Sequence, residues 1–393
     1  RGFPTGEEVR WAVTGTDADG RTRWSEWRTW RVPDAPEGLP ELTLEVAGDP
    51  GFRYLAATVI FADQVGSAVV IVDAEGRYVW WTEPGEVALT PELRDTEGGP
   101  VMGWMEAAAD RDVDAAAFVE VPLSGARRTR TPLAAGHHDA AVLPGGELAF
   151  LAMAFEDHEL DGVGVPMVSD EVRLTTLGAS EAAPTDLLWS TFADMPVAAR
   201  GTCDHIRQPT SRLGRDGVRE WTHANSLVHL ADEDTLLVGA RYTDWLYAID
   251  DSTGELRWVL NGLGSDFVGP DDAPVWRSPS DTDLWSHAHL SDAWSGGAMV
   301  FDNGDHHQPP VSVAMEVAWD ASSRTAEVVW SRPHPDGGAT GALGDVRRVG
   351  DDVLVSWAGL GTVEVVGRDQ TTRWRLGLSD GMFARVLPID ALR

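Results

Sequence analysis

Three histidines in this chain stand at similar distances before predicted hairpin turns. His223 lies nine residues before the turn in "ADED", and His287 lies nine residues before the turn in "SGG". His138 lies seven or eight residues before the turn in "PGG", and the same counting places Asp305 opposite His287. Residues equally far from a turn face each other across an antiparallel hairpin. We therefore expect the three histidines to reach a similar depth in similar elements.

The residues around these histidines point to anion chemistry. Counting from the turns places Arg241 opposite His223 and Asn303 opposite His289. The planar guanidinium of Arg241 offers donors that fit a tetrahedral oxyanion, and the amide of Asn225 can donate as well. Neutral histidines can donate hydrogen bonds, and one can act as nucleophile or general base near neutral pH. These residue types predict a site that binds an anion.

The segments that must position these residues repeat along the chain. Short β-rich runs broken by Gly, Asp and Pro dominate, and helical periodicity is nearly absent. A hairpin whose second run often ends in Trp occurs in six copies. The copies start at Val69, Ala117, Glu171, Trp245, Val313 and Thr362. Another hairpin precedes most of them, and two hairpins make the four strands of one propeller blade.

The repeat predicts an all-β fold, a six-bladed β-propeller over residues 41–393. The run Met382 to Asp390 is expected to pair with early strands and close the ring. Inner strands run along the central channel of a propeller, so equal depth predicts that the histidines converge at one mouth of that channel. A tandem of β-sandwiches is the alternative architecture.

Residues 1–40 form a separate N-terminal β segment in this interpretation. They hold a hairpin-like pair of runs with alternating Trp and Arg, followed by the proline-rich linker "PDAPEGLP". We expect either the tail of a small β-sandwich or a strand pair packed on the propeller.

Composition narrows the function classes. The chain has 393 residues, a net charge of −32 and no lysine, which argues against nucleic acid and anionic membranes as partners. No apolar run reaches the length of a transmembrane helix. Cys203 is the single cysteine, so no intrachain disulfide can form. The chain opens without a signal peptide, and we expect that an upstream segment was removed or left out.

Three stretches together carry a family resemblance. They read "HHDAAVLPGGELAFLA", "WTHANSLVHLADEDTLLVGARYTDWLYAIDDSTGELRWVLNG" and "SHAHLSDAWSGGAMVFDNGD". Their order and spacing resemble the PAPS-independent arylsulfate sulfotransferases, the bacterial six-bladed propeller type, over roughly residues 40–390. The resemblance implies an exported protein, periplasmic or extracellular. It implies sulfuryl transfer from an aryl sulfate to a phenol through a covalent sulfohistidine, with no cofactor and no nucleotide donor.

The resemblance also implies roles for individual residues. The histidine ahead of "FDNGD", which is His287, would be the nucleophile. His223, Arg241, His138 and Asn225 would hold the sulfate oxygens. The remaining predicted substrate-binding residues are His137, His289 and Asn303.

The chain departs from the family pattern at several positions. Relatives usually have Gln where this chain has Ser286, and a small residue where it has His289, so His289 is a rival nucleophile. The Ser-Arg that follows "FDNG" in relatives is missing here.

Other interpretations stay open. A propeller without chemistry could serve as a binding or surface-assembly module, and a quinone or metal oxidoreductase is a further class. The histidines of "HAH" and "DHH" could bind a transition metal, "DHELDG" hints at calcium, and Cys203 could be a thiol nucleophile.

Overall fold

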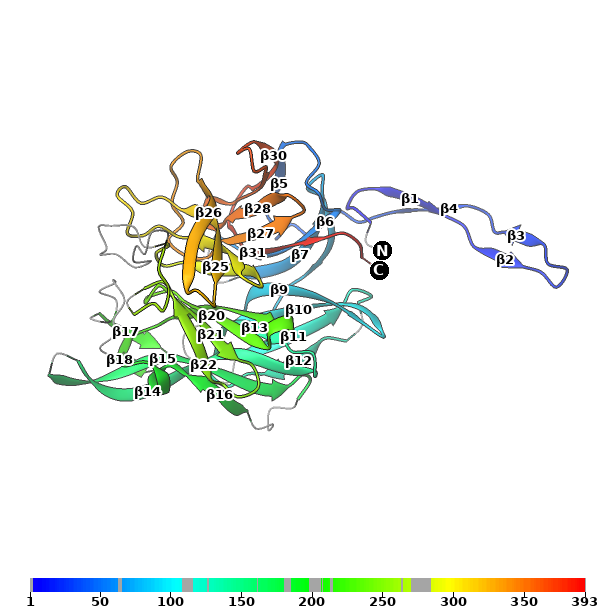
Figure 1. The fold of residues 1–393 in the computed structure, drawn as a ribbon. Helices are drawn as coiled ribbons and strands as arrows, with labels where there is room; N and C mark the ends of the chain where they lie inside the picture. The colour runs from blue at the N-terminus through cyan, green and yellow to red at the C-terminus, as the bar shows by residue number, and fades with distance from the viewer. Residues whose placement is uncertain are drawn as a thin grey trace.

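The chain folds almost entirely into β-strands (Figure 1). The computed structural model describes residues 3–62, 66–107, 116–125, 127–160, 162–179, 185–197, 206, 208–212, 215–262, 264–269 and 284–392. Helical segments there include α1 (Thr191–Asp194), η2 (Ala231–Glu233) and η4 (Ala358–Leu360), each about one turn long. The all-β class expected from the sequence is confirmed.

Six sheets carry most of the described chain, and all their strand pairs are antiparallel except one parallel pair between residues 167–168 and 219–220. In five of the sheets the first four strands follow the order of the sequence. The sheets are listed here from their first strand outward. They are β31 (Met382–Ile389), β6 (Tyr54–Ile60), β7 (Ser67–Asp73), β8 (Tyr78–Thr82); β9 (Val87–Thr96), β10 (Gly99–Ala107), β11 (Ala117–Pro122), β12 (Thr129–Pro132); β13 (Gly136–Val142), β14 (Glu147–Leu160), β15 (Val163–Thr176), β16 (Asp186–Ser190), with β18 (Arg215–Glu220) and β17 (Pro209–Arg212) beyond β15; β19 (Ala224–Leu230), β20 (Thr235–Ala240), β21 (Trp245–Asp250), β22 (Leu256–Leu260); β23 (His289–Trp294), β24 (Gly297–Asp302), β25 (Val313–Asp320), β26 (Thr325–Pro333); and β27 (Asp345–Val349), β28 (Asp352–Trp357), β29 (Thr362–Val366), β30 (Thr372–Leu378), β5 (Leu42–Val46).

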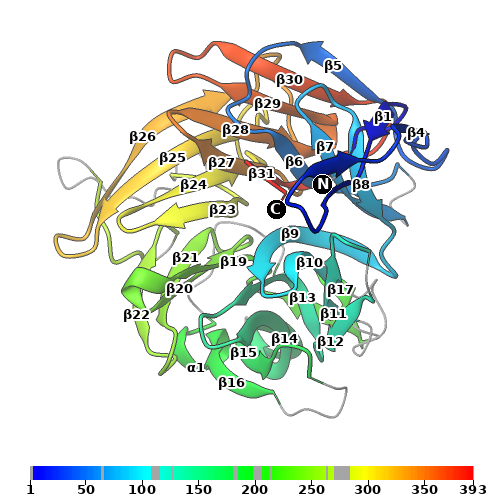
Figure 2. The same ribbon diagram turned by 90° about the vertical axis from the view of Figure 1, so that its right-hand side faces the viewer.

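The sheets are arranged round a common centre, as in a propeller (Figure 2). Their first strands β9, β13, β19, β23, β27 and β31 contact one another in succession, and β31 contacts β9 in turn. The C-terminal strand β31 pairs with β6, with Met382 opposite Ile60. The expected pairing of the closing run with an early strand is thus confirmed.

The repeated hairpins seen in the sequence form the outer strands of the sheets. All six copies supply the third and fourth strands, from β7–β8 through β29–β30. Asp side chains close several of these turns. Asp250 Oδ1 accepts hydrogen bonds from the backbone N–H of Ser252 and Thr253, and Asp320 Oδ1 accepts one from Ser322. Such turns favour Asp because its side chain bonds the backbone two residues on.

The apolar core lies between adjacent sheets. One cluster joins Leu151 and Val172 of one sheet with Leu236 and Tyr247 of the next. All seven residues of β7, "SAVVIVD", are buried, because neighbouring sheets cover both faces of this strand. Strands covered on both faces read as continuous apolar runs, so alternation is weak in the sequence here.

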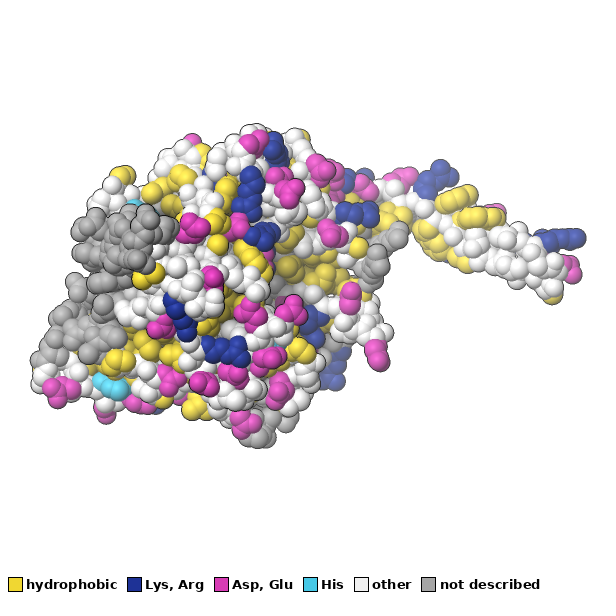
Figure 3. Space-filling view, viewed as in Figure 1, with side chains coloured by type: hydrophobic (Ala, Val, Ile, Leu, Met, Phe, Trp, Pro, Cys, Tyr) yellow, Lys and Arg dark blue, Asp and Glu magenta, His cyan; other side chains and the backbone are white. Residues whose placement is uncertain are grey.

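Residues 8–31 form an arm that extends from the body (Figure 1). It consists of the paired strands β1 (Glu8–Trp11) and β4 (Arg28–Arg31) and the hairpin β2 (Thr14–Thr16) with β3 (Thr22–Trp24). Trp24 and Trp27 are 65% and 59% exposed, and their rings stack on each other. Figure 3 shows hydrophobic side chains along this arm and acidic ones scattered over the visible face of the body.

Candidate active site

Three consecutive sheets each present one histidine with left-handed backbone at or just before their first strand. The φ angles are +51° at His138, +52° at His223 and +55° at His287. Residues other than glycine rarely adopt this conformation, and such backbone strain gathers at functional sites. The histidines that the sequence placed at one depth therefore share a local conformation as well.

Buried carboxylates hold two of these strand heads in place. Asp244 Oδ1 accepts a hydrogen bond of 2.7 Å from the backbone N–H of His287. Asp170 Oδ2 accepts one of 2.6 Å from the backbone N–H of Ala224, next to His223. Asp170 lies in β15 and Asp244 in the turn between β20 and β21, so each comes from the sheet that precedes the strand it holds. These hydrogen bonds from the neighbouring sheet thus hold the left-handed backbone at His223 and His287.

The side chains of the three histidines lie in one row of rings. The ring centres of His138 and His223 are 4.8 Å apart. Tyr242 lies between the other two histidines, 4.6 Å from His223 and 5.7 Å from His287. The structure therefore brings the predicted histidines to one place. Tyr242 is a member that the sequence interpretation missed, although it directly follows Arg241.

His287 is buried and its imidazole is held by Asp305. Its Nδ1 lies 2.7 Å from Asp305 Oδ2. A carboxylate oxygen only accepts, so Nδ1 carries the hydrogen and Nε2 keeps the lone pair. The side chain is almost fully buried, and this burial lowers the pKa of His287 to about 4, although the bond to Asp305 opposes the shift. The imidazole is therefore uncharged at neutral pH.

Arg241 joins the same network through Asp305. Its backbone N–H donates to the carbonyl of His223 at 3.1 Å, which confirms the predicted cross-strand pairing. One guanidinium nitrogen donates to Asp305 Oδ2 at 3.0 Å and to the Gly341 carbonyl at 2.5 Å. The buried Nε has no hydrogen-bond partner among the described residues. Burial opposes ionisation of Asp305, but the bond to His287 and the Arg241 charge together lower its pKa.

Further carboxylates face the other histidines. His223 Nδ1 lies 2.8 Å from Glu220 Oε1, and because a carboxylate oxygen only accepts, Nδ1 is the donor. His137 Nδ1 lies 2.9 Å from His138 Nδ1. The Nε2 of His137 lies 3.1 Å from Asp170 Oδ1, without the geometry of a hydrogen bond. His137 therefore contacts the row of rings through His138.

His289 and Asn303 form a separate buried pair. His289 Nδ1 lies 2.9 Å from Asn303 Oδ1. Because an amide oxygen only accepts, the histidine is the donor. Burial lowers the pKa of His289 well below its ordinary value. The predicted strand register needs correction, because His289 stands opposite Phe301. The centre of the turn lies half a residue earlier than the counting assumed, which shifts the partner by one residue, and a bulge between Leu290 and Asp292 shifts it by another. Only the side chain reaches Asn303.

The two asparagines of the predicted set join neighbouring sheets. Asn225 Nδ2 donates to the Ala288 carbonyl at 2.9 Å. Asn303 Nδ2 donates to the carbonyls of Thr340 and Leu343 at 2.7 and 2.9 Å. Both side chains are buried. Their part in substrate binding stays a prediction, whereas their structural bonds are evident.

The histidines of the alternative metal motifs lie among the described residues. Within those ranges, no three His, Cys, Asp or Glu side chains form a group that could hold a metal ion. His289 turns to Asn303 and His307 to Asp302, at 2.9 Å each. Cys203 lies outside the described residues, as does one residue of "DHELDG". No helix in the described part of the chain has both the length and the apolar character of a membrane span.

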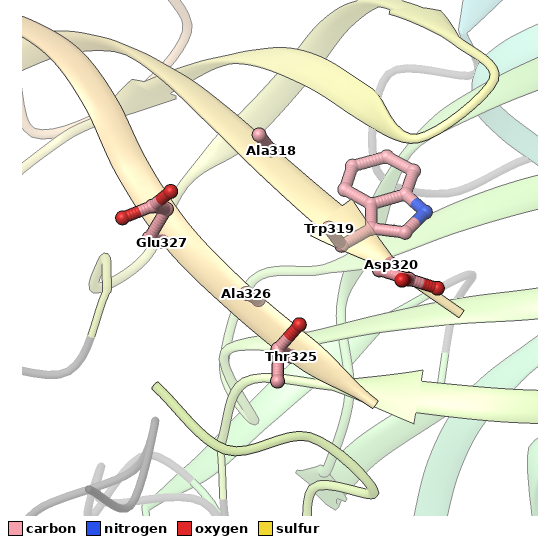
Figure 4. Close-up of a pocket in the computed structure, with 6 residues that line it drawn as sticks. All are labelled: Ala318, Trp319, Asp320, Thr325, Ala326 and Glu327. Atoms are coloured by element: carbon pink, nitrogen blue, oxygen red, sulfur yellow. The ribbon is translucent and has the colours of Figure 1, made fainter. Parts of the chain in front are cut away.

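A separate hollow lies at the end of the β25–β26 hairpin (Figure 4). It is lined by Ala318, Trp319, Asp320, Thr325, Ala326 and Glu327. None of the predicted site residues lines it, and its carboxylates would repel an anion. We assign it no part in the anion site.

The chain matches one family model and is similar to several solved structures. The family model described as Arylsulfotransferase (ASST) matches residues 51–374. None of the curated proteins matches the chain. A protein of unknown function from Bacteroides caccae is similar in structure at 12% identity and a TM-score of 0.45, over 86% of this chain and 100% of that one. The β-propeller domain of Cps50 (Swd1) from Myceliophteria thermophila has 11% identity and a TM-score of 0.45, over 88% and 89% of the two chains.

The matched range covers most of the chain and contains His138, His223, Arg241 and His287. On this match, the chain belongs to the arylsulfotransferase family.

Proposed function

We propose that this protein transfers a sulfuryl group from an aryl sulfate to a phenol through a covalent intermediate on His287. One observation carries the proposal: Asp305 fixes the hydrogen of His287 on Nδ1, which places the lone pair of the imidazole on Nε2. A nucleophile activated by an oriented partner is the usual arrangement in covalent catalysis. Family membership supports aryl sulfate and phenol as the substrates.

The reaction has two balanced steps. His287 Nε2 attacks sulfur as the bond between sulfur and the aryl oxygen breaks, and the electron pair leaves with that oxygen. The oxygen of an acceptor phenol then attacks the same sulfur, and the pair of the nitrogen–sulfur bond returns to Nε2. As in phosphoryl transfer, catalysis rests on positioning and on stabilising charge at the equatorial oxygens.

Arg241, His223 and His138 would stabilise the sulfuryl oxygens. The buried Nε of Arg241, which has no partner among the described residues, supports this role, because an unpaired buried donor is costly and an anionic oxygen would satisfy it. Asn225, His137, His289 and Asn303 would support these groups around the anion. The Arg241 guanidinium would also offset the field of a protein with net charge −32.

The architecture and location belong to the same proposal. The six sheets would be the blades of a six-bladed propeller over residues 41–393, with residues 1–40 as a separate N-terminal segment. The protein would act in the periplasm or outside the cell, which fractionation of the producing cells would test.

A binding module without chemistry is the second candidate. It is favoured by the bonds of Arg241, whose guanidinium already engages Asp305 and the Gly341 carbonyl. A guanidinium held in this way has fewer donors to offer to a sulfate. In that case the row of rings would bind an anion and transfer nothing.

Release of nitrophenol from 4-nitrophenyl sulfate tests the proposal, with and without added phenol. We expect release that depends on phenol in the native protein and its loss in His287→Ala. The control is His229→Ala, because His229 pairs with Asp251 at 2.8 Å outside the site and should leave activity unchanged. Mass spectrometry of rapidly quenched protein should find the sulfuryl group on His287. Its presence on His289 would transfer the role to the rival, and no release at all would favour the binding module.

A further inference from the structure

His306 touches the nitrogen of His287 that attacks in the proposed reaction. The two Nε2 atoms are 3.2 Å apart, and the ring centres are 4.7 Å apart with the planes nearly perpendicular. We propose that His306 is the acid and base of the transfer: it protonates the oxygen of the departing phenol and later removes the proton of the acceptor phenol. This inference rests on the proposed function.

The contact with Asp305 decides which ring donates. His287 Nδ1 gives its hydrogen to Asp305 Oδ2, so His287 Nε2 can only accept. His306 Nε2 therefore carries the hydrogen in the contact between the two rings. Before substrate binds, the lone pair of His287 Nε2, which must attack sulfur, therefore accepts a hydrogen bond from His306.

The direction of this bond places His306 on the side of the leaving group. A hydrogen-bond donor lies roughly along the lone pair of its acceptor, and in an in-line displacement the nucleophile, the transferred atom and the leaving oxygen share that line. The incoming sulfur must therefore displace His306 outward from His287. After that displacement, the N–H of His306 faces the far side of sulfur, where the leaving oxygen stands.

The position of His306 in the chain permits this displacement. His306 lies in the connection between β24 and β25 and is partly exposed, whereas His287 is almost fully buried. The next residue, His307, anchors the connection through Nε2 at 2.9 Å from Asp302 Oδ2. The side chain of His306 can thus swing on a loop whose base is fixed.

Protons balance over the cycle. In the first step, protonated His306 gives its Nε2 proton to the aryl oxygen as the sulfur–oxygen bond breaks, so the phenol leaves neutral and His306 becomes neutral. In the second step, His306 Nε2 takes the proton of the acceptor phenol as its oxygen attacks sulfur. The nitrogen–sulfur pair returns to His287, and His306 is again protonated.

The test compares two donors that need this proton to different degrees. Phenyl sulfate expels a basic phenolate, whereas 4-nitrophenyl sulfate expels an anion that is stable without a proton. We expect His306→Gln to slow the burst of phenol release from phenyl sulfate by on the order of 10²–10⁴-fold, the usual value of general acid catalysis, and to slow that from 4-nitrophenyl sulfate by less than about tenfold. His307→Gln, in the same loop, should change both donors alike.

The outcomes separate this inference from the proposed function. Equal slowing of the two donors in His306→Gln, or no slowing with phenyl sulfate, would overturn the role of His306 while leaving the transferase standing. Native protein that releases phenol from neither donor would overturn the proposed function itself. His306→Asn provides a second variant that should show the same dependence on the donor.

Discussion

His287 Nδ1 and Asp305 Oδ2 lie 2.7 Å apart, and the same carboxylate oxygen accepts a hydrogen bond from Arg241 at 3.0 Å. Asp305 thus orients both the proposed nucleophile and the one arginine in the predicted set. The carboxylate can also stabilise the positive charge that develops on the imidazole during attack. This relationship leads to the first prediction.

Replacing Asp305 by Asn should lower kcat by on the order of 10³-fold, because the amide can hold the wrong tautomer of His287 and loses the charge. The measurement is kcat with saturating 4-nitrophenyl sulfate and phenol. Asp251→Asn is the matched control, because Asp251 contacts His229 at 2.8 Å. This second carboxylate–histidine pair lies away from the site. Equal activity in Asp305→Asn and native protein would remove Asp305 from the mechanism.

The pH dependence of the first step should report His287. Its neutral form attacks, and burial lowers its pKa to about 4, so nitrophenol release should stay constant from neutral pH downward and fall only as pH 4 is approached. Asp305→Asn should move this midpoint to still lower pH, because the bond to Asp305 raises the pKa of His287. The burst rate against pH is the measurement. A midpoint at the ordinary histidine value of 6.5 would contradict the buried, neutral nucleophile.

Acid stability should follow from the same burial. The folded pKa of His287 lies below its value in the unfolded chain, so the unfolded state binds more protons between about pH 6.5 and pH 4. Stability is therefore expected to be lost as the pH falls through this window. His287→Gln should flatten the dependence of the urea midpoint on pH there. An unchanged slope in the variant would show that other groups govern acid unfolding.

Tyr242 should act as a spacer in the row of rings. It stands between His223 and His287, at 4.6 and 5.7 Å, and Arg241 lies over its face at 5.3 Å. Tyr242→Ala should reduce kcat by about 10²-fold, since small misplacements of reacting groups are costly. Tyr242→Phe keeps the ring and should retain more activity. Equal kcat values in Tyr242→Ala and native protein would refute the spacer role.

The amide of Asn225 should stabilise the fold. Its bond to the Ala288 carbonyl crosses between two sheets, and removal leaves a buried acceptor unpaired, so Asn225→Ala should lower the free energy of unfolding by about 1–3 kcal/mol. Urea denaturation measures this change. The exposed strand residue Thr176 provides the control, because Thr176→Ala should stay within about 0.5 kcal/mol. Equal effects at both positions would contradict the role of the amide.

The hairpin repeat and the turns were sufficient to place the three histidines at one depth. The repeat followed from local chemistry, since Asp and Gly close turns between short apolar strands, and the pairing of His223 with Arg241 followed from counting. The register at His289 was wrong by two residues, because counting along the sequence reveals neither the exact centre of the turn nor a bulge, and each shifts the partner by one residue.

By itself, the sequence determined the all-β class, the repeated hairpins and the identity of the histidines, because turn chemistry and apolar runs are local properties. Only the tertiary structure decided which groups those histidines contact. Counting placed Asp305 opposite His287, but the left-handed backbones, the Tyr242 spacer and the contact from His306 depend on how the sheets and their connections pack. Burial then decides the charge of His287, and burial is a property of the assembled sheets that no single stretch of sequence contains.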